Sequence, residues 1–151
     1  MKVFRKVYGF FIRHVLGGNA ELLVFTAPDG TFRFPGGTVD DGEDLGTGLR
    51  RELREETGIY DFKVLRELGI HHYYKPDVQK HVEQHDYLSQ AMTSLPDRFS
   101  FTVQSHDKDN GMVFNYHWIE ISEFRKLDWE FRDVVTPAYI PEFFKQENPK
   151  Q

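Results

Sequence analysis

The sequence predicts an α/β protein in which a central mixed sheet lies between helices. Strand-like segments occur along most of the chain, one amphipathic helical segment interrupts them, and further helix signals come near the C-terminus. Runs of strands that are interrupted by one helix and followed by another are typical of a sheet covered by helices. The chain has 151 residues, the length of one domain, and we expect residues 1–151 to form that domain.

Five segments are expected to be strands because they are rich in β-branched and aromatic residues. The first two are separated by Gly17, Gly18 and Asn19, a turn signal that predicts a hairpin or a short loop. Beyond the strands, Ser122 and Thr136, which precedes a proline, are candidate helix starts. The expected strands are residues 6–13, 21–26, 64–74, 82–91 and 112–121.

The central helix is expected over residues 45–57. Leu45, Leu49 and Leu53 recur every four residues, so they form an apolar stripe that can dock on the sheet. Gly58 is well placed to end the helix, because glycine readily adopts the left-handed conformation found after helix C-termini.

The composition excludes several classes of protein. With 19 Lys and Arg against 24 Asp and Glu, the net charge is −5, so bulk nucleic-acid binding is disfavoured. The chain has no cysteine, which excludes disulfides, thiolate metal sites and thiol nucleophiles. No window approaches the roughly 18 apolar residues of a membrane span. We therefore expect a soluble, cytoplasmic protein with no membrane partner.

Three acidic residues of the central helix point to a metal site. At 100° per residue, Glu52, Glu55 and Glu56 lie on one side of the helix, next to the apolar stripe. Their mutual repulsion costs roughly 0.2–0.5 kcal/mol per pair, and their position in the last turn opposes the helix dipole. A bound cation would remove both costs. Oxygen ligands of this kind suit a hard ion, Mg²⁺ or Mn²⁺.

Residues around the acidic cluster can position it. Arg51 lies four residues before Glu55, the spacing at which an ion pair can hold a carboxylate in one rotamer. Gly36 and Gly37 allow the backbone to approach a ligand closely, so a carbonyl group there could face the same ion. Glu43 lies near the helix start, where it could bond free amides or pair with Arg51, both structural roles.

Written in order, these residues form a pattern of fixed spacing. Gly37 is followed after five residues by Glu43, and after seven more by residues 51–59, which read RELREETGI. This pattern resembles the Nudix box at every defined position. The box occupies 23 of the 151 residues, and the preceding Phe34, Pro35 and Gly36 are similar to the usual approach to it.

The resemblance implies a Nudix hydrolase with an α/β/α sandwich fold and a central mixed sheet. It also implies metal-dependent cleavage of a small molecule in which a nucleoside diphosphate is linked to another group. Carried over by position, Glu52, Glu55 and Glu56 match the metal carboxylates, Gly37 the carbonyl ligand and Arg51 the residue that orients them. Homodimers are common among similar proteins, so a homodimer is compatible with the resemblance.

The reaction needs a group that takes a proton from water. A metal that bridges phosphate oxygens lowers the pKa of its bound water and aligns that water for attack on phosphorus. Glu56 or an acid outside the box could then accept the proton. The outside candidates are Glu83, His85 and Asp86, and Glu83 is our first choice.

The sequence does not identify the substrate. Phe34, Tyr73 and Tyr74 could stack on a base, although aromatic residues in such places are more often core or sheet surface. Tyrosine at this distance after the box resembles dinucleoside polyphosphate hydrolases, whereas Pro76 resembles ADP-ribose hydrolases. Residues 106–111 form either a simple mobile loop or a lid.

Two other functions are kept as alternatives. The first is a Nudix-like module that binds or senses a nucleotide without cleaving it. The second is a pyrophosphohydrolase that acts on RNA 5′ ends. Clustering of Lys2, Arg5, Lys6 and Arg33 near the site would favour RNA, and dispersal of these cations would count against it.

Overall fold

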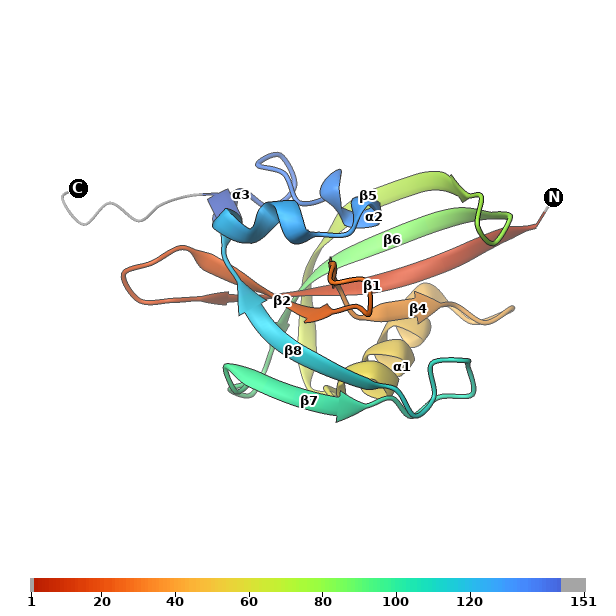
Figure 1. Cartoon of the computed structure of the whole chain (residues 1–151), viewed down its shortest axis with the longest axis horizontal. Helices are drawn as coiled ribbons and strands as arrows, with labels where there is room; N and C mark the ends of the chain where they lie inside the picture. The colour runs from red at the N-terminus through yellow and green to blue at the C-terminus, as the bar shows by residue number, and fades with distance from the viewer. Residues whose placement is uncertain (1, 145–151) are drawn as a thin grey trace.

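The computed structural model describes residues 2–144 and contains one mixed sheet with helices on both faces (Figure 1). The sheet has the strand order β5-β6-β1-β2-β8-β7, with β3 paired to β2 and β4 paired to β1. The strands are β1 (Val3–His14), β2 (Ala20–Thr26), β3 (Phe32–Arg33), β4 (Gly36–Thr38), β5 (Phe62–Lys75), β6 (Lys80–Ala91), β7 (Arg98–Thr102) and β8 (Val113–Ile119). The helices are α1 (Leu45–Thr57), the 3₁₀ helix η1 (Ile121–Lys126), α2 (Trp129–Arg132) and α3 (Pro141–Phe144).

The long strand β1 organises the sheet. It pairs in parallel with β6, and antiparallel with β2 and with β4. Near its start, Lys6 lies opposite Thr38 of β4, and further along Ile12 lies opposite Leu22 of β2. Because one edge of β1 is shared between two partners, a gap opens in the sheet between β4 and β2. The mixed sheet expected from the sequence is confirmed.

Alternate residues of β1 enter two separate cores. Tyr8, Phe10 and Ile12 pack with the apolar residues of the C-terminal segment, including Phe131 and Phe143. On the opposite face, their neighbours Val7 and Phe11 pack against Leu49 and Leu53 of α1. This is the two-residue side-chain period of a strand that is buried on both faces. The result is a three-layer arrangement with α1 below the sheet and η1, α2 and α3 above it in Figure 1.

Helix α1 has the bounds expected from the sequence, residues 45–57. Asp44 caps its start, because its carboxylate accepts a hydrogen bond from the backbone amide of Thr47 at 2.8 Å. Gly58 ends the helix in the left-handed conformation, with a φ of 75°, and donates its N–H to the carbonyl of Arg54.

The C-terminal helices depart from the expectation. Ser122 lies within η1, but no described helix starts at Thr136. Asp128 caps α2 instead, and Pro141 is the first residue of α3, a position where a missing N–H costs nothing. None of the described helices is long and apolar enough to cross a membrane.

The structure also has three strands that the sequence analysis missed. β3 has two residues and β4 has three. Strands this short show no recognisable alternation of apolar and polar residues. β7 does carry a signal, because Phe99 and Phe101 alternate with polar residues and the strand pairs with β8.

Candidate active site

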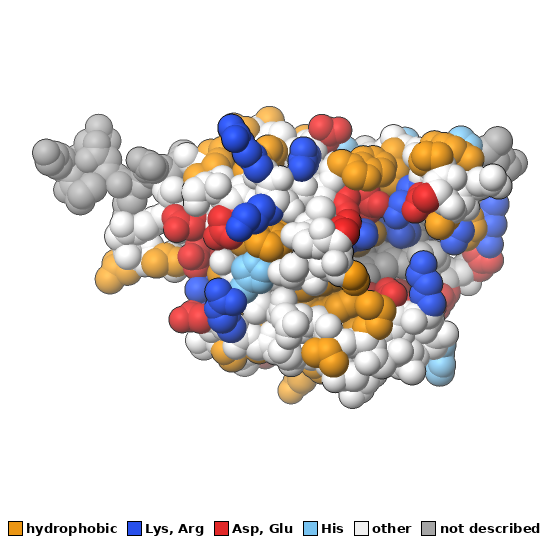
Figure 2. All heavy atoms as spheres, viewed as in Figure 1, with side chains coloured by type: hydrophobic (Ala, Val, Ile, Leu, Met, Phe, Trp, Pro, Cys, Tyr) orange, Lys and Arg blue, Asp and Glu red, His pale blue; other side chains and the backbone are white. Residues whose placement is uncertain are grey.

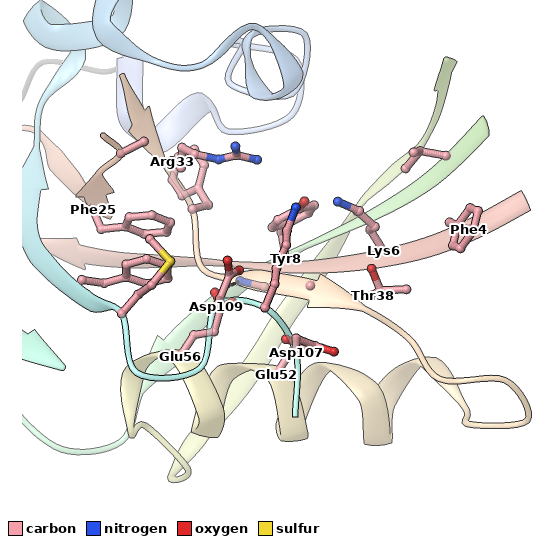
Figure 3. A pocket seen from close by; sticks show the side chains of 18 of the residues that line it. Phe4, Lys6, Tyr8, Phe25, Arg33, Thr38, Glu52, Glu56, Asp107 and Asp109 are labelled. Carbon is pink, nitrogen blue, oxygen red and sulfur yellow. Dashed lines mark hydrogen bonds between the residues drawn. The ribbon is translucent and has the colours of Figure 1, made fainter. Parts of the chain in front are cut away.

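A cavity of about 550 Å³ opens where β4 separates from β2. Strands β1 and β4, helix α1 and the loop after β7 contribute its walls, and Figure 2 shows acidic and basic side chains gathered around the hollow. Basic and acidic side chains lie on different sides of this cavity. Figure 3 shows Lys6 and Arg33 on one side, with Glu52, Glu56 and the loop acids on the other.

Glu52 and Glu56 are the buried carboxylates of this cavity. Only 2% of Glu52 and 7% of Glu56 are exposed. Burial raises the pKa of Glu52 to about 7 and that of Glu56 to about 8. The loop residues Asp107 and Asp109 add to these shifts as nearby negative charges. The cavity therefore holds two carboxyl groups whose ionisation is costly without a cation.

The backbone of β4 lies directly against these carboxyl groups. The N–H of Gly36 donates a hydrogen bond of 3.1 Å to Glu56 Oε1. A Cβ atom on Gly37 would lie 2.3 Å from Glu52 Oε2, far inside contact distance. Any side chain at position 37 would therefore force the Glu52 carboxylate to shift from its place.

Arg51 holds the other acids of the motif. Its guanidinium donates two hydrogen bonds of 2.8 Å to the carboxylate of Glu43, which is the fork geometry of a strong pair. The hydrogen bonds from Arg51 lower the pKa of Glu43 to about 2. Nη1 of the same guanidinium lies 3.1 Å from Glu52 and 3.1 Å from Glu55. One cation thus fixes three carboxylates, and Glu55 faces Arg51.

The residues fit a hard divalent ion that arrives with a phosphate ligand. Among residues 2–144, no group of three or more His, Asp or Glu side chains is arranged to hold a metal alone. Mg²⁺, however, usually takes one or two carboxylates and completes its shell with water and substrate phosphates. Glu52 and Glu56, beside the bare backbone of Gly37, meet this smaller requirement with oxygen donors.

Five cations line the cavity: Lys6, Arg33, Lys75, Lys80 and Lys108. The buried Glu130 of α2 lies 2.7 Å from Lys75 Nζ and 3.0 Å from Arg33 Nη2. The sequence analysis considered only Lys6 and Arg33 of this group. Lys75, Lys80 and Lys108 were missed because they are far from Lys6 and Arg33 in the sequence, and only the folded chain brings them to one cavity.

Glu83, the residue expected as general base, is not among the lining residues within the described chain. The cavity receives Lys80 and Val82 from β6, so strand alternation turns Glu83 to the face of the sheet that α1 covers. There its carboxylate lies 2.6 Å from His85 Nε2.

Asp86, another candidate base, is fully buried and accepts a hydrogen bond from Gln84. It is not among the lining residues of the described chain either. The acids that do face Glu52 and Glu56 come from the 106–111 loop.

The three aromatic candidates for substrate binding have different environments. Phe34 contributes to the cavity wall, but it is 1% exposed and its ring stacks on Phe10 at 3.8 Å. Tyr73 donates its hydroxyl to Gln84, and Tyr74 packs beside His81. Neither tyrosine is among the lining residues of the described chain.

Apolar lining comes instead from residues that the sequence did not single out. Phe25 and Phe114 stack with 4.1 Å between ring centroids, and both line the cavity next to Met112. Phe4 lines it near Lys6 (Figure 3). These side chains supply flat apolar surface of the kind on which a base can stack.

Comparisons with known proteins agree with this architecture. The solved structure of an Ap4A hydrolase from C. elegans superposes with a TM-score of 0.67 at 22% identity, covering 95% of this chain and 100% of that one. At this level of identity the likeness shows the fold, a mixed α/β sandwich.

The family follows from sequence. A model of the NUDIX domain matches residues 8–139, so the chain belongs to the Nudix family. Nudix hydrolase 26, chloroplastic, from Arabidopsis thaliana is 32% identical over 127 residues, which are 78% of this chain and 56% of the plant protein. The chain thus spans just over half of that relative. An RNA pyrophosphohydrolase from Bartonella clarridgeiae is 24% identical over 120 residues, 74% of this chain and 69% of that protein.

Proposed function

We propose that the protein is a metal-dependent pyrophosphohydrolase that cleaves a nucleoside diphosphate linked to another group. The observation that carries the proposal is the pair of buried carboxyl groups, Glu52 and Glu56, held against the β4 backbone and facing cations across one cavity. Family membership supports the same reaction class.

In this proposal Glu52, Glu56 and the carbonyl of Gly37 hold Mg²⁺ or Mn²⁺, with Glu55 as a further carboxylate that Arg51 orients. When bound, such an ion would supply charge neutralisation at the phosphate and a more reactive water. Arg51 keeps Glu52 and Glu55 in fixed positions by its hydrogen bonds. The cations on the far side bind substrate oxygens and offset the charge of the incoming anion.

Glu56 is assigned the proton transfer, because it lines the cavity and Glu83 is not among the lining residues of the described chain. Water attacks phosphorus, its proton passes to the Glu56 carboxylate, and the bond from phosphorus to the bridging oxygen breaks. Each half of the substrate leaves with a phosphate. In the protein without a bound ion, burial raises the pKa of Glu56 to about 8.

The test is a panel of nucleoside diphosphate conjugates assayed for nucleotide and phosphate release with Mg²⁺ or Mn²⁺. We expect turnover that EDTA abolishes and that Glu56→Gln lowers by at least about 100-fold, within the range of general-base catalysis. Glu83→Gln is the matched control and should stay within about threefold of wild type. Equal turnover by wild type and Glu56→Gln would refute the role of Glu56. Tight nucleotide binding with no turnover of any conjugate would favour the sensing module.

A further inference from the structure

A second cavity lies outside the candidate active site. Its volume is about 610 Å³, within the roughly 300–1,000 Å³ of small-molecule sites. Strands β7 and β8 form its floor near one edge of the sheet (Figure 1), and η1 contributes one wall. Among residues 2–144, none lines both this cavity and the candidate active site. We call it the η1 cleft, and a ligand bound there occupies a separate site.

The floor of the η1 cleft is a polar face of the sheet. In the antiparallel pairing of β7 with β8, Arg98 lies opposite His117 and Ser100 lies opposite Asn115. Residues that are directly opposite in such a pair share one face of the sheet, so these four side chains form one polar patch. Between them along β8, Tyr116 enters the core under α1 on the other face.

Two cations of the η1 cleft have no anionic partner in the described chain. Asp97, which precedes Arg98 in the sequence, pairs with Arg13 instead. Among residues 2–144, Arg98 and Lys126 of η1 have no carboxylate within ion-pair distance. Lys126 Nζ lies 5.5 Å from the centroid of the Phe32 ring. Both positive charges are therefore available to a ligand.

His117 lies close to both of these cations. Its ring packs edge-on against Phe32, with 4.6 Å between centroids. Burial lowers the pKa of His117, and Arg98 and Lys126 lower it further as nearby positive charges, whereas Glu123 opposes them. With a neutral imidazole, the cleft thus holds two positive charges against one negative charge.

We propose that the η1 cleft binds the phosphate group of a small molecule, either a free phosphate ion or a phosphate monoester. Arg98 and Lys126 are its charge partners, and His117 and Asn115 are further hydrogen-bond donors. This site shares no described lining residue with the candidate active site, so the inference does not rest on the proposed function.

The donors of the η1 cleft favour a phosphate group over a carboxylate. A phosphate monoester carries a charge of about −1.5 to −2 at pH 7 and three acceptor oxygens. The cleft offers donors from three elements, namely Arg98 on β7, Asn115 on β8 and Lys126 on η1. The side-chain oxygen of Asn115 already accepts from Ser100, which leaves its amide N–H groups for a ligand. A carboxylate has one charge and two oxygens, and a single arginine satisfies it.

His117 reports directly on occupancy of the cleft. A phosphate group that neutralises Arg98 and Lys126 removes the repulsion that lowers the pKa of His117. It also places negative charge beside the ring, so phosphate binding should raise this pKa and protein protonation should increase near pH 6.5.

The first experiment follows the His117 ring by NMR as the pH is varied, with and without inorganic phosphate, in EDTA at constant ionic strength. His117→Gln identifies the signal. We expect phosphate to raise the pKa of His117 by at least about 0.5 and acetate to raise it by less than about 0.2. An unchanged pKa in phosphate would overturn the proposal. An equal rise in acetate would overturn the assignment to phosphate.

The second experiment tests the charge partners. The phosphate concentration that gives half of the His117 signal change is measured at pH 6.5. We expect Arg98→Met and Lys126→Met each to raise it at least about fivefold. Arg125→Met is the matched control, because Arg125 is an exposed cation of the same helix that does not line the cleft. It should stay within about twofold. Equal values for wild type and both cleft variants would overturn the proposal.

The source of the phosphate group is tested with a nucleoside 5′-monophosphate in the same titration. Half-saturation at lower concentration than with inorganic phosphate would support a monoester as the ligand, and the reverse order would support a free phosphate ion. A single-stranded RNA without terminal phosphate that changes the His117 signal at lower concentration than both would overturn the assignment to a small molecule.

Discussion

At the scale of single residues, the motif contains carboxyl groups with opposite properties. Glu43 pairs with Arg51 by two short hydrogen bonds, and its pKa is lowered to about 2. Glu56 accepts one backbone hydrogen bond in a buried cavity, and its pKa is raised to about 8. The first carboxylate stabilises the fold, and the second is available for chemistry because the fold leaves it without a cation.

The first prediction concerns Glu43 and acid stability. Because its pKa is lower in the folded protein than in the unfolded chain, ionised Glu43 stabilises the fold above about pH 4.5. That contribution is lost as the pH falls toward about 2. We expect Glu43→Gln to unfold at lower urea concentration than wild type at pH 6, with the difference shrinking as the pH approaches 2. A difference that does not change with pH would show that the ion pair with Arg51 is not its cause.

At the scale of elements, the contact between β4 and α1 forms the acid side of the cavity. β4 has three residues, yet it brings two glycines against the last turns of a helix that the sheet holds in place. Leu49 and Leu53 fix the rotation of this helix, because they are fully buried against β1. That rotation directs Glu52 and Glu56 toward β4 and leaves Glu55 beside Arg51.

The second prediction tests this contact by adding a methyl group. Gly37→Ala would place a Cβ atom 2.3 Å from Glu52 Oε2, so the carboxylate must move away from the backbone of β4. We expect a loss of about 1–3 kcal/mol in unfolding free energy, as for overpacking, and at least about a tenfold loss of turnover. Gly46→Ala in the first turn of α1 is the control, because the added Cβ would meet only Asp44 Oδ1 at 3.5 Å. It should stabilise the protein by about 0.5–1 kcal/mol. A stable, fully active Gly37→Ala would contradict the tight fit.

At the scale of the whole molecule, the cavity exists because β1 divides its edge between two partners. The two cores then lie on opposite faces of the sheet, one under α1 and the other under the C-terminal segment. The elements outside both cores place charged side chains at the gap between β4 and β2. Helix α1 supplies the acids, while α2 supplies Glu130, which holds cations from β3 and β5. Charged groups held by the two outer layers therefore come together at this gap.

The third prediction is that the site costs the molecule stability. Because the pKa of Glu56 is higher in the folded protein than in the unfolded chain, its contribution to stability is full below about pH 4.5. It is lost as the pH rises through about 8. Glu56→Gln does not titrate, so in EDTA it should become more stable than wild type by at least about 1 kcal/mol near pH 8. Urea unfolding at pH 5 and pH 8 checks this. A gain of equal size at both pH values would argue against ionisation as the cause.

The local features of the protein could be read from its sequence. The period of Leu45, Leu49 and Leu53 predicted α1, the left-handed Gly58 confirmed its end, and the spacing from Gly37 to Ile59 indicated the family. Each of these features depends on residues close together in the chain. The C-terminal helices and β3 and β4 could not be placed in the same way, because they are short and held mainly by tertiary contacts.

The long-range features needed the folded chain. Strand alternation in β6 turned Glu83 away from the cavity, and the register of that strand follows from its pairing with β1. Lys6, Lys75 and Glu130 are separated by dozens of residues and come close only because β1, β5 and α2 converge. The sequence by itself determined the helix, the acids on it and the family, since these depend on local spacing. Only the tertiary structure decided which charges face the substrate, since burial and charge compensation depend on every element around the cavity.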